Sequence, residues 1–294
     1  MTTRVYLLSI TACLITFTAA AGCSAQSNPP PTNPWTVVAV RERRAGEVPF
    51  EERSSYLWPT PDPNNVPGPD SLIARVESDE QLHSFIDIED LRTGESHRLI
   101  DANAFLPHWS PDGRYLGCEV WKSPGQLSEL TVVDVATRSV IIDPEIGASA
   151  GQMKWSPDSR ILAADGVIYG RPRTMLYAVK IPEGLVIPLD TLQVLGDYEF
   201  SWSPDGQWIA FSRATRLDRH GDHPIAADLW IADTQSGRKW PLLETTDWVE
   251  TNPLWITDGS LQIDRSHVDG GGLGPKQRVV IELSILKGGS GRSP

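Results

Sequence analysis

The sequence predicts an all-β fold built from repeated four-stranded sheets. The main observation is a short motif that opens with tryptophan and occurs four times, at Trp109–Gly113, Trp155–Ser159, Trp202–Gly206 and Trp255–Gly259. The four tryptophans are 46, 47 and 53 residues apart, and a period in this range is typical of structural repeats. The composition agrees, because 24 glycines, 24 prolines and 11 tryptophans in 294 residues favour short strands and many turns.

Each repeat predicts two tight turns and four strands. In Trp-Ser-Pro-Asp-Gly, proline presets φ, aspartate accepts hydrogen bonds from nearby amides and glycine takes positive φ, which favours a hairpin turn. The turn aspartates are Asp112, Asp158, Asp205 and Asp258. A second turn signal follows at Asp90–Gly94, Asp134–Arg138, Lys180–Gly184 and Asp233–Gly237. After Trp202, Ile209 and Phe211 alternate with Trp208, Ala210 and Ser212, as expected of a strand.

A four-stranded meander cannot bury both of its faces alone, but several meanders packed around an axis can, and this arrangement is a β-propeller. The motif, followed by an apolar strand and then by Asp-x-x-Thr-Gly, resembles the WD40-like repeat of TolB-type propellers over about residues 58–286. The sequence departs from that pattern at Ser159, at Ile256 and Thr257, and at Lys180. The resemblance implies an interaction module of the cell envelope.

Five blades are expected, because a degenerate repeat begins at Trp58 and precedes the four clear ones. The last repeat has strand patterns near Leu261–Asp264 and Arg278–Leu286 but lacks a fourth strand. The run Trp35–Val40 belongs to no repeat, so we expect it to supply that strand and to close the ring. Six blades are the alternative, since the TolB-type resemblance implies that number.

The N-terminus predicts export and a lipid anchor. Arg4 precedes a 13-residue apolar stretch that is too short for a permanent membrane span, so residues 1–22 are expected to be a signal peptide. The small residues that end at Cys23 resemble the lipobox of bacterial lipoproteins, although Ala20 stands where leucine is usual. This resemblance implies lipidation of Cys23 and a location outside the bacterial cytoplasmic membrane, in the periplasm or at the cell surface. Cleavage after Ala21 without a lipid is the alternative.

The remaining organisation follows from composition. Residues 23–34 are expected to form a Pro-rich tether, 35–286 the propeller and 287–294 a flexible tail. The formal net charge of −12 argues against nucleic acid and anionic membrane surfaces as partners, so the membrane is contacted through the lipid anchor only. Cys118 shares a strand face with Leu116 and Val120 and is expected to be buried. A monomer is expected.

Candidate binding residues lie on the face that carries the longer connections. In each meander, the turns between the first and second and between the third and fourth strands are short, whereas the other connections are irregular: Trp121–Glu129, Asp165–Arg173, Arg213–Asp228 and Asp264–Gln277. Variable loops on a rigid scaffold commonly carry binding sites. We therefore expect a protein or peptide of the cell envelope to bind there, through Arg213, Arg216, Arg219, His220, Asp222, His223, Arg171, Arg173 and Arg265. The arginines favour a carboxylate or another anionic group in the ligand, and solvated loops without a role are the alternative.

No catalytic site, cofactor or metal is expected. The sequence contains no Gly-x-Ser-x-Gly, His-Glu-x-x-His or Gly-rich phosphate motif. Metal ligation by His220, Asp222 and His223 is possible by spacing, but no other cluster of cysteine or histidine supports it. The motif tryptophans and aspartates are interpreted as packing and turn residues. The alternative function is a carbohydrate-active or carbohydrate-binding propeller, with the faint candidate carboxylates Asp165, Asp228 and Asp264.

Overall fold

The computed structural model describes residues 32–53, 62, 64–122, 128–142, 146–147, 152–168, 174–191, 199–217, 224–269 and 272–285. The chain divides into two units, 1–32 and 33–294, and the fold described below belongs to the second unit. The predicted signal peptide and Cys23 lie outside the described residues, as does most of the predicted tether. Within the described part of the chain, no helix has the length and hydropathy needed to cross a membrane.

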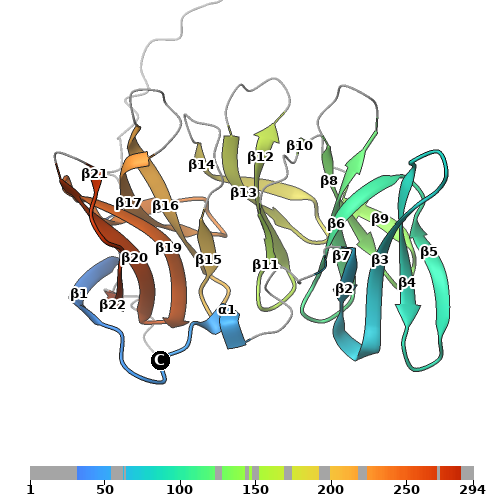
Figure 1. The fold of residues 1–294 in the computed structure, drawn as a ribbon, viewed down its shortest axis with the longest axis horizontal. Helices are drawn as coiled ribbons and strands as arrows, with labels where there is room; N and C mark the ends of the chain where they lie inside the picture. The colour runs from blue at the N-terminus through green and yellow to red at the C-terminus, as the bar shows by residue number, and fades with distance from the viewer. Residues whose placement is uncertain are drawn as a thin grey trace, which may run out of the picture. The chain divides into compact units, whose positions relative to one another are not determined.

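Antiparallel four-stranded meanders follow one another along the chain (Figure 1). The first consists of β2 (Asn65–Pro67), β3 (Leu72–Ser78), β4 (Ser84–Asp90) and β5 (Glu95–Ile100). The second consists of β6 (Asn103–Trp109), β7 (Tyr115–Trp121), β8 (Glu129–Asp134) and β9 (Ser139–Ile142). The third consists of β11 (Met153–Trp155), β12 (Ile161–Ile168), β13 (Thr174–Lys180) and β14 (Leu185–Thr191).

The fourth meander consists of β15 (Phe200–Trp202), β16 (Trp208–Leu217), β17 (Pro224–Asp233) and β18 (Lys239–Leu243). The fifth consists of β19 (Trp248–Thr257), β20 (Ser260–Asp269), β22 (Gln277–Ile285) and β1 (Trp35–Glu42). Four short elements complete the described fold: α1 (Phe50–Arg53), the 3-10 turn η1 (Pro69–Ser71), β10 (Ile146–Gly147) and β21 (Gly272–Leu273). The predicted all-β class and four-stranded unit are therefore confirmed.

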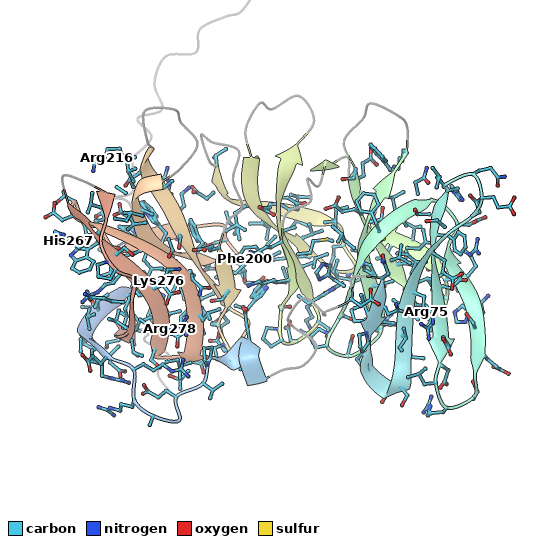
Figure 2. All side chains as sticks on the ribbon, in the orientation of Figure 1. Arg75, Phe200, Arg216, His267, Lys276 and Arg278 are labelled. Atoms are coloured by element: carbon cyan, nitrogen blue, oxygen red, sulfur yellow. The ribbon has the colours of Figure 1, made fainter. Side chains whose placement is uncertain are left out.

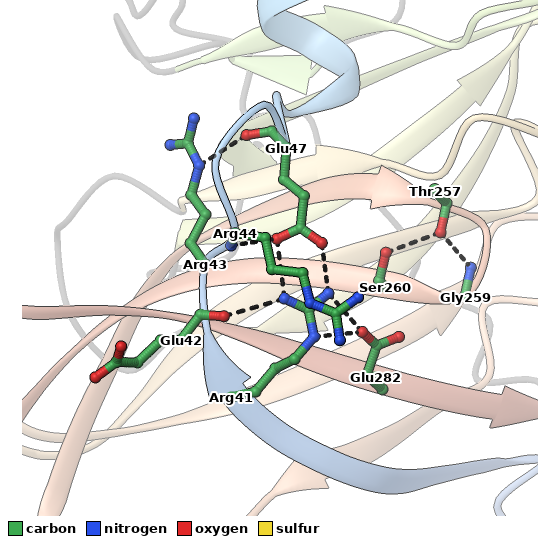
Figure 3. A network of polar contacts seen from close by, with 9 residues as sticks. All are labelled: Arg41, Glu42, Arg43, Arg44, Glu47, Thr257, Gly259, Ser260 and Glu282. Atoms are coloured by element: carbon green, nitrogen blue, oxygen red, sulfur yellow. Dashed lines mark hydrogen bonds and ion pairs between the residues drawn. The ribbon is translucent and has the colours of Figure 1, made fainter.

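The N-terminal strand β1 completes the last meander. It pairs antiparallel with β22 from Trp35↔Ile285 to Glu42↔Val279, which confirms the pairing expected from the sequence. Arg41 anchors this strand, because its guanidinium lies 2.5 Å from the Glu47 carboxylate and 2.6 Å from that of Glu282 (Figure 3). The closure of a ring by this strand, and the number of blades in that ring, stay predictions.

The motif tryptophans join neighbouring meanders. Each lies on the first strand of its own meander. In three of them the indole N–H reaches a backbone carbonyl of the meander before it, whereas Trp255 Nε1 has no hydrogen-bond partner among the described residues. Trp109 donates to Val66 O, Trp155 to His108 O and Trp202 to Lys154 O, each at 3.0 Å. Trp255 is fully buried. A large ring with one polar atom suits this position, since it fills the space between two sheets and satisfies a carbonyl there.

The motif aspartates organise the turn after each tryptophan. Asp112 accepts hydrogen bonds from the Ser110 hydroxyl at 2.6 Å and from the Arg114 amide at 3.0 Å. Asp158 and Asp205 accept from the corresponding groups of their own turns. Asp258 differs, because it accepts from the backbone amide of Asp205 in the neighbouring meander at 3.1 Å.

Ser159 replaces the glycine of the motif and still adopts a φ of 62°, in the left-handed region where glycine is favoured. Its hydroxyl accepts a hydrogen bond from the Asp112 amide at 3.0 Å, which glycine could not do. This departure from the repeat pattern therefore links the second and third meanders.

The core lies between successive sheets. Ile209 and Phe211 of β16 pack against residues of the third meander, whereas Ala210 faces the fifth. Cys118 is buried as expected, in one cluster with Leu116 and Val120. Both faces of the inner strands are thus covered by neighbouring sheets.

Two of the predicted loops need correction. Most of the loop predicted over 264–277 is strand, since β20 continues to Asp269 and β21 covers Gly272–Leu273. Most of the predicted loop 213–228 is strand, because β16 and β17 stay paired from Trp208↔Asp233 up to Leu217↔Pro224. Charged side chains on β16 hide this strand from a hydrophobicity pattern, but two register shifts beside Arg216 let the backbone pairing continue.

Candidate functional site

A pocket opens at the ends of β16 and β17 that face their connection. Its volume is about 330 Å³, and Figure 2 labels Arg216 beside it. Three threonines and two carboxyl groups share the lining with one arginine and one alanine, which is the set Thr215, Arg216, Ala226, Asp228, Glu244, Thr245 and Thr246. The last three come from the connection between β18 and β19. The pocket therefore lies on the face where binding was expected.

Two buried carboxyl groups meet below this pocket. Asp228 on β17 is 7% exposed and Glu250 on β19 is 1% exposed. They are neighbours because β17 and β19 pair in parallel at Ala227↔Val249, one residue before each of them. Thr245 connects the two, since its amide donates to Asp228 Oδ1 at 3.1 Å and its hydroxyl to Glu250 Oε1 at 3.3 Å.

This environment favours the protonated form of both acids. Burial raises the pKa of Glu250 to about 7; the Thr245 hydrogen bond opposes the shift and the charge of Asp228 adds to it. Burial also raises the pKa of Asp228, against the Thr245 amide and the charge of Arg213. Within the described residues, Glu250 Oε2 has no hydrogen-bond partner. The pair thus has the features of a functional site, where desolvation and like charge act together.

Arg213, the first of the expected binding residues, is engaged in an ion-pair cluster. Its Nε lies 3.2 Å from the carboxylate of Asp190, whose side chain is completely buried, and Lys239 contacts the same carboxylate. The guanidinium also stacks over Trp230, with 4.9 Å from its carbon to the ring centroid. Asp190 belongs to β14, so this cluster ties the third meander to the fourth. Arg213 therefore has a carboxylate partner within the fold.

Arg265 lies on β20, opposite Glu250 in the strand register. Its guanidinium stacks over Trp248 at 4.4 Å, and Trp248 makes an edge contact with His267, with 5.0 Å between the ring centroids. The positive charge lowers the pKa of Glu250 without overcoming the effect of burial. Arg213 and Arg265 are thus the register partners of Asp228 and Glu250, and Arg216 lines the pocket together with Asp228.

A second group of carboxyls lies between the second and third meanders. Glu119 on β7 and Asp165 on β12 are 1% and 2% exposed, and Tyr177 on β13 is fully buried. Burial raises the pKa of Glu119 to about 7, against a 2.5 Å hydrogen bond from Ser128, and the Asp165 charge adds to the shift. Burial and both carboxylates raise the pKa of Tyr177.

The other candidate carboxylate, Asp264, is held differently. Burial works to raise its pKa, but hydrogen bonds from Arg278 and Asn252 and the charge of Lys276 outweigh that effect and lower it. Arg278 Nε lies 2.9 Å from this carboxylate. Asp264 is therefore a structural ion-pair partner, in contrast to Asp165 and Asp228, which each lie beside a second buried acid.

Several expected site residues lie outside the described residues, namely Arg171, Arg173, Arg219, His220, Asp222, His223 and Cys23. The expected metal alternative at His220 cannot be placed for the same reason. Among the described residues, no group of three or more histidine, cysteine or acidic side chains is arranged to hold a metal ion.

Solved structures with a similar fold include several β-propellers. The β-propeller domain of the Trilobed protease from Pyrococcus furiosus aligns with a TM-score of 0.52 and 17% identity, over 74% of this chain and 68% of that one. The chain has the β-propeller fold. Weaker alignments are found with oligogalacturonate lyase from Vibrio parahaemolyticus (TM-score 0.48, 11% identity, 72% of this chain and 63% of that one) and TolB from Acinetobacter baumannii (0.39, 18%, 72% and 51%). The propeller thus spans about half the length of that TolB chain.

No protein-family model matches the sequence, and no curated protein matches it. The predicted propeller fold is confirmed, and at these identities the likeness concerns the fold alone.

The residues that define the site chemically carry little signal in the sequence. Glu250 and Glu119 stand in strand patterns with no motif around them, and Asp190 follows a Pro-Leu pair that predicts only a strand end. Asp228 was noticed as a faint candidate, but its neighbour in space is 22 positions away in the sequence, in the next repeat. The one signal in the sequence that could have indicated these residues is an acidic residue at a strand position where the repeats otherwise have apolar residues.

Proposed function

We propose that this propeller is a non-enzymatic binding module that recognises a protein or peptide of the cell envelope through its pocket face. The supporting observation is a pocket of about 330 Å³ that Arg216 and Asp228 line, with the buried carboxyl group of Glu250 behind Thr245. A polar pocket on a rigid β scaffold is suited to specific recognition, since its groups are already positioned before the ligand arrives.

The proposed contacts extend to the segment between β16 and β17, which carries Arg219, His220, Asp222 and His223. The test is cross-linking in native cells followed by affinity capture. It compares the unchanged chain with a variant in which Asn-Gly replaces residues 218–223. Because Leu217 and Pro224 are register partners, a two-residue turn can connect them without altering β16 or β17.

The unchanged chain is expected to capture a partner that the Asn-Gly variant loses, with a melting temperature within a few degrees of the original. Capture of the same partners by both chains would overturn the role of this segment. A large fall in melting temperature would instead assign residues 218–223 to stability.

We propose further that the module is exported and held outside the cytoplasmic membrane by a lipid on Cys23. A Cys23→Ser substitution removes the thiol group to which a thioether lipid would be attached. The substituted protein is expected to move from the membrane fraction to the soluble extracytoplasmic fraction, with the unchanged chain as the control. An unaltered membrane fraction would contradict the anchor.

A carbohydrate-active propeller is the second candidate, favoured by one observation. The pKa of Glu119 is raised to about 7 beside Asp165. Glycoside hydrolysis uses one carboxyl group with a raised pKa near a second, ionised carboxyl group. Incubation with a panel of neutral and acidic oligosaccharides tests it: cleavage that is lost in Glu119→Gln would support this candidate over the binding module.

A further inference from the structure

The pocket beside Arg216 differs in charge from the face that the sequence predicts. Its lining contributes two carboxyl groups, Asp228 and Glu244, and one guanidinium, Arg216. Behind Thr245 lies a third carboxyl group, Glu250, within hydrogen-bond distance of the Thr245 hydroxyl. The floor is therefore acidic, and the single lining cation stands on an exposed side chain.

The buried carboxyls below the pocket need hydrogen-bond donors. Glu250 is 1% exposed, and within the described residues its Oε2 accepts no hydrogen bond. Thr245 donates to each carboxyl group, but burying two carboxylates side by side still costs free energy, because each is desolvated and each repels the other. A ligand that brings positive charge and several donors would stabilise the ionised form of these acids, whereas an anionic group would add repulsion.

The nearby arginines do not meet this need. Arg213 is held by the buried carboxylate of Asp190 and by stacking on Trp230. Arg265 stacks over Trp248 and lies opposite Glu250 on the neighbouring strand. Its charge lowers the pKa of Glu250, but that pKa remains raised. Arg213 and Arg265 thus have structural partners of their own, and the carboxyl group of Asp228 still lines the pocket.

We infer that this pocket takes the ammonium or guanidinium group of a lysine or arginine side chain from the protein or peptide partner, with Asp228 as its direct contact and Glu250 as the second charge behind it. The volume of about 330 Å³ is near the lower limit for small-molecule pockets and suits one inserted side chain. This assignment rests on the proposed function and reverses the anionic ligand expected from the sequence.

The test is a titration of the purified full chain by ¹H–¹⁵N NMR, observing the amides of Thr245 and Thr246. The probes are the Nα-acetyl methylamides of lysine and arginine, with those of norleucine and glutamate as neutral and anionic controls. Saturable shifts are expected with the two cationic probes. Equal shifts with norleucine, or stronger ones with glutamate, would overturn the assignment.

Three variants locate the contact. Asp228→Asn keeps an oxygen that can accept from the Thr245 amide but loses the charge, and is expected to weaken lysine-probe binding about tenfold. Asp247→Asn is the matched control, since it removes one exposed carboxylate from the same connection outside the pocket lining, and should change affinity less than about twofold. Unchanged amide signals elsewhere verify folding, and Glu250→Gln gives an independent second loss of affinity.

The same variants separate this inference from the proposed function. If native-cell capture depends on residues 218–223 but is equal for the unchanged chain and Asp228→Asn, the binding module stands and the pocket assignment falls. If the cationic probes bind through Asp228 but no cellular partner is captured, the pocket assignment stands and the proposed protein partner falls.

Discussion

At the residue scale, this propeller places carboxyl groups where burial controls their protonation. Glu119 and Glu250 each lie on an inner strand, and each has a pKa raised to about 7 beside a second acid, Asp165 or Asp228. A raised folded-state pKa means that the folded chain retains a proton that the unfolded chain has lost. Such groups oppose folding as the pH increases from about 4.5, and their full cost is present above about 7.

Glu250→Gln is therefore expected to stabilise the protein at pH 8 and to leave its stability at pH 4 nearly unchanged. Since one pKa unit corresponds to about 1.4 kcal/mol, ionising Glu250 in the folded state costs on the order of 3 kcal/mol. Urea unfolding from pH 4 to pH 8 measures the effect. A variant whose stability falls as steeply with pH as that of the unchanged chain would contradict it.

At the scale of elements, the tight turn after each tryptophan determines where the second strand of the blade begins. In the fourth meander, Asp205 accepts from the Ser203 hydroxyl and from the Gln207 amide, and Ser203 in turn accepts from the Trp208 amide. Gly206 has a φ of 71°, so the turn also needs a residue that tolerates the left-handed region. The same local chemistry recurs in the second and third meanders, because it depends only on residues within five positions.

Replacing Asp205 with alanine removes both acceptor contacts and is expected to lower the free energy of unfolding by about 1 kcal/mol. Asp205→Asn retains one carbonyl oxygen that can accept and is the matched control, with a smaller loss. Chemical denaturation of both variants measures the difference. An equal loss in the two would show that the charge, and not the acceptor geometry, stabilises the turn.

At the scale of the whole described fold, the segment after β1 reaches across to inner strands of other meanders. Glu51 of α1 accepts from Lys154 Nζ on β11 at 3.0 Å and from the Trp202 amide on β15 at 3.3 Å. Lys154 also donates to Phe200 O at 2.6 Å. Glu51 and Lys154 are 2% and 8% exposed, and burial raises the pKa of Glu51. One buried ion pair thus joins the N-terminal segment to the third and fourth meanders.

Glu51→Ala leaves Lys154 buried without its carboxylate and is expected to cost about 3–5 kcal/mol of unfolding free energy. The double variant Glu51→Ala with Lys154→Met removes both charges and should recover most of that loss. Denaturant midpoints of the single and double variants measure this coupling. Additive losses in the double variant would contradict a paired role.

The repeat motifs alone determined the all-β class, the four-stranded unit and the pairing of β1 with β22. The first two depend on local turn chemistry. The pairing follows because the last repeat lacked a fourth strand and one N-terminal strand pattern belonged to no repeat. The burial of Cys118 also followed from strand alternation. The tertiary structure alone decided which side chains meet between blades: Asp228 with Glu250, Glu119 with Asp165, Arg213 with Asp190, and Glu51 with Lys154. These contacts join separate repeats or distant segments, so they depend on the packing of one sheet against the next, and no local pattern encodes that geometry.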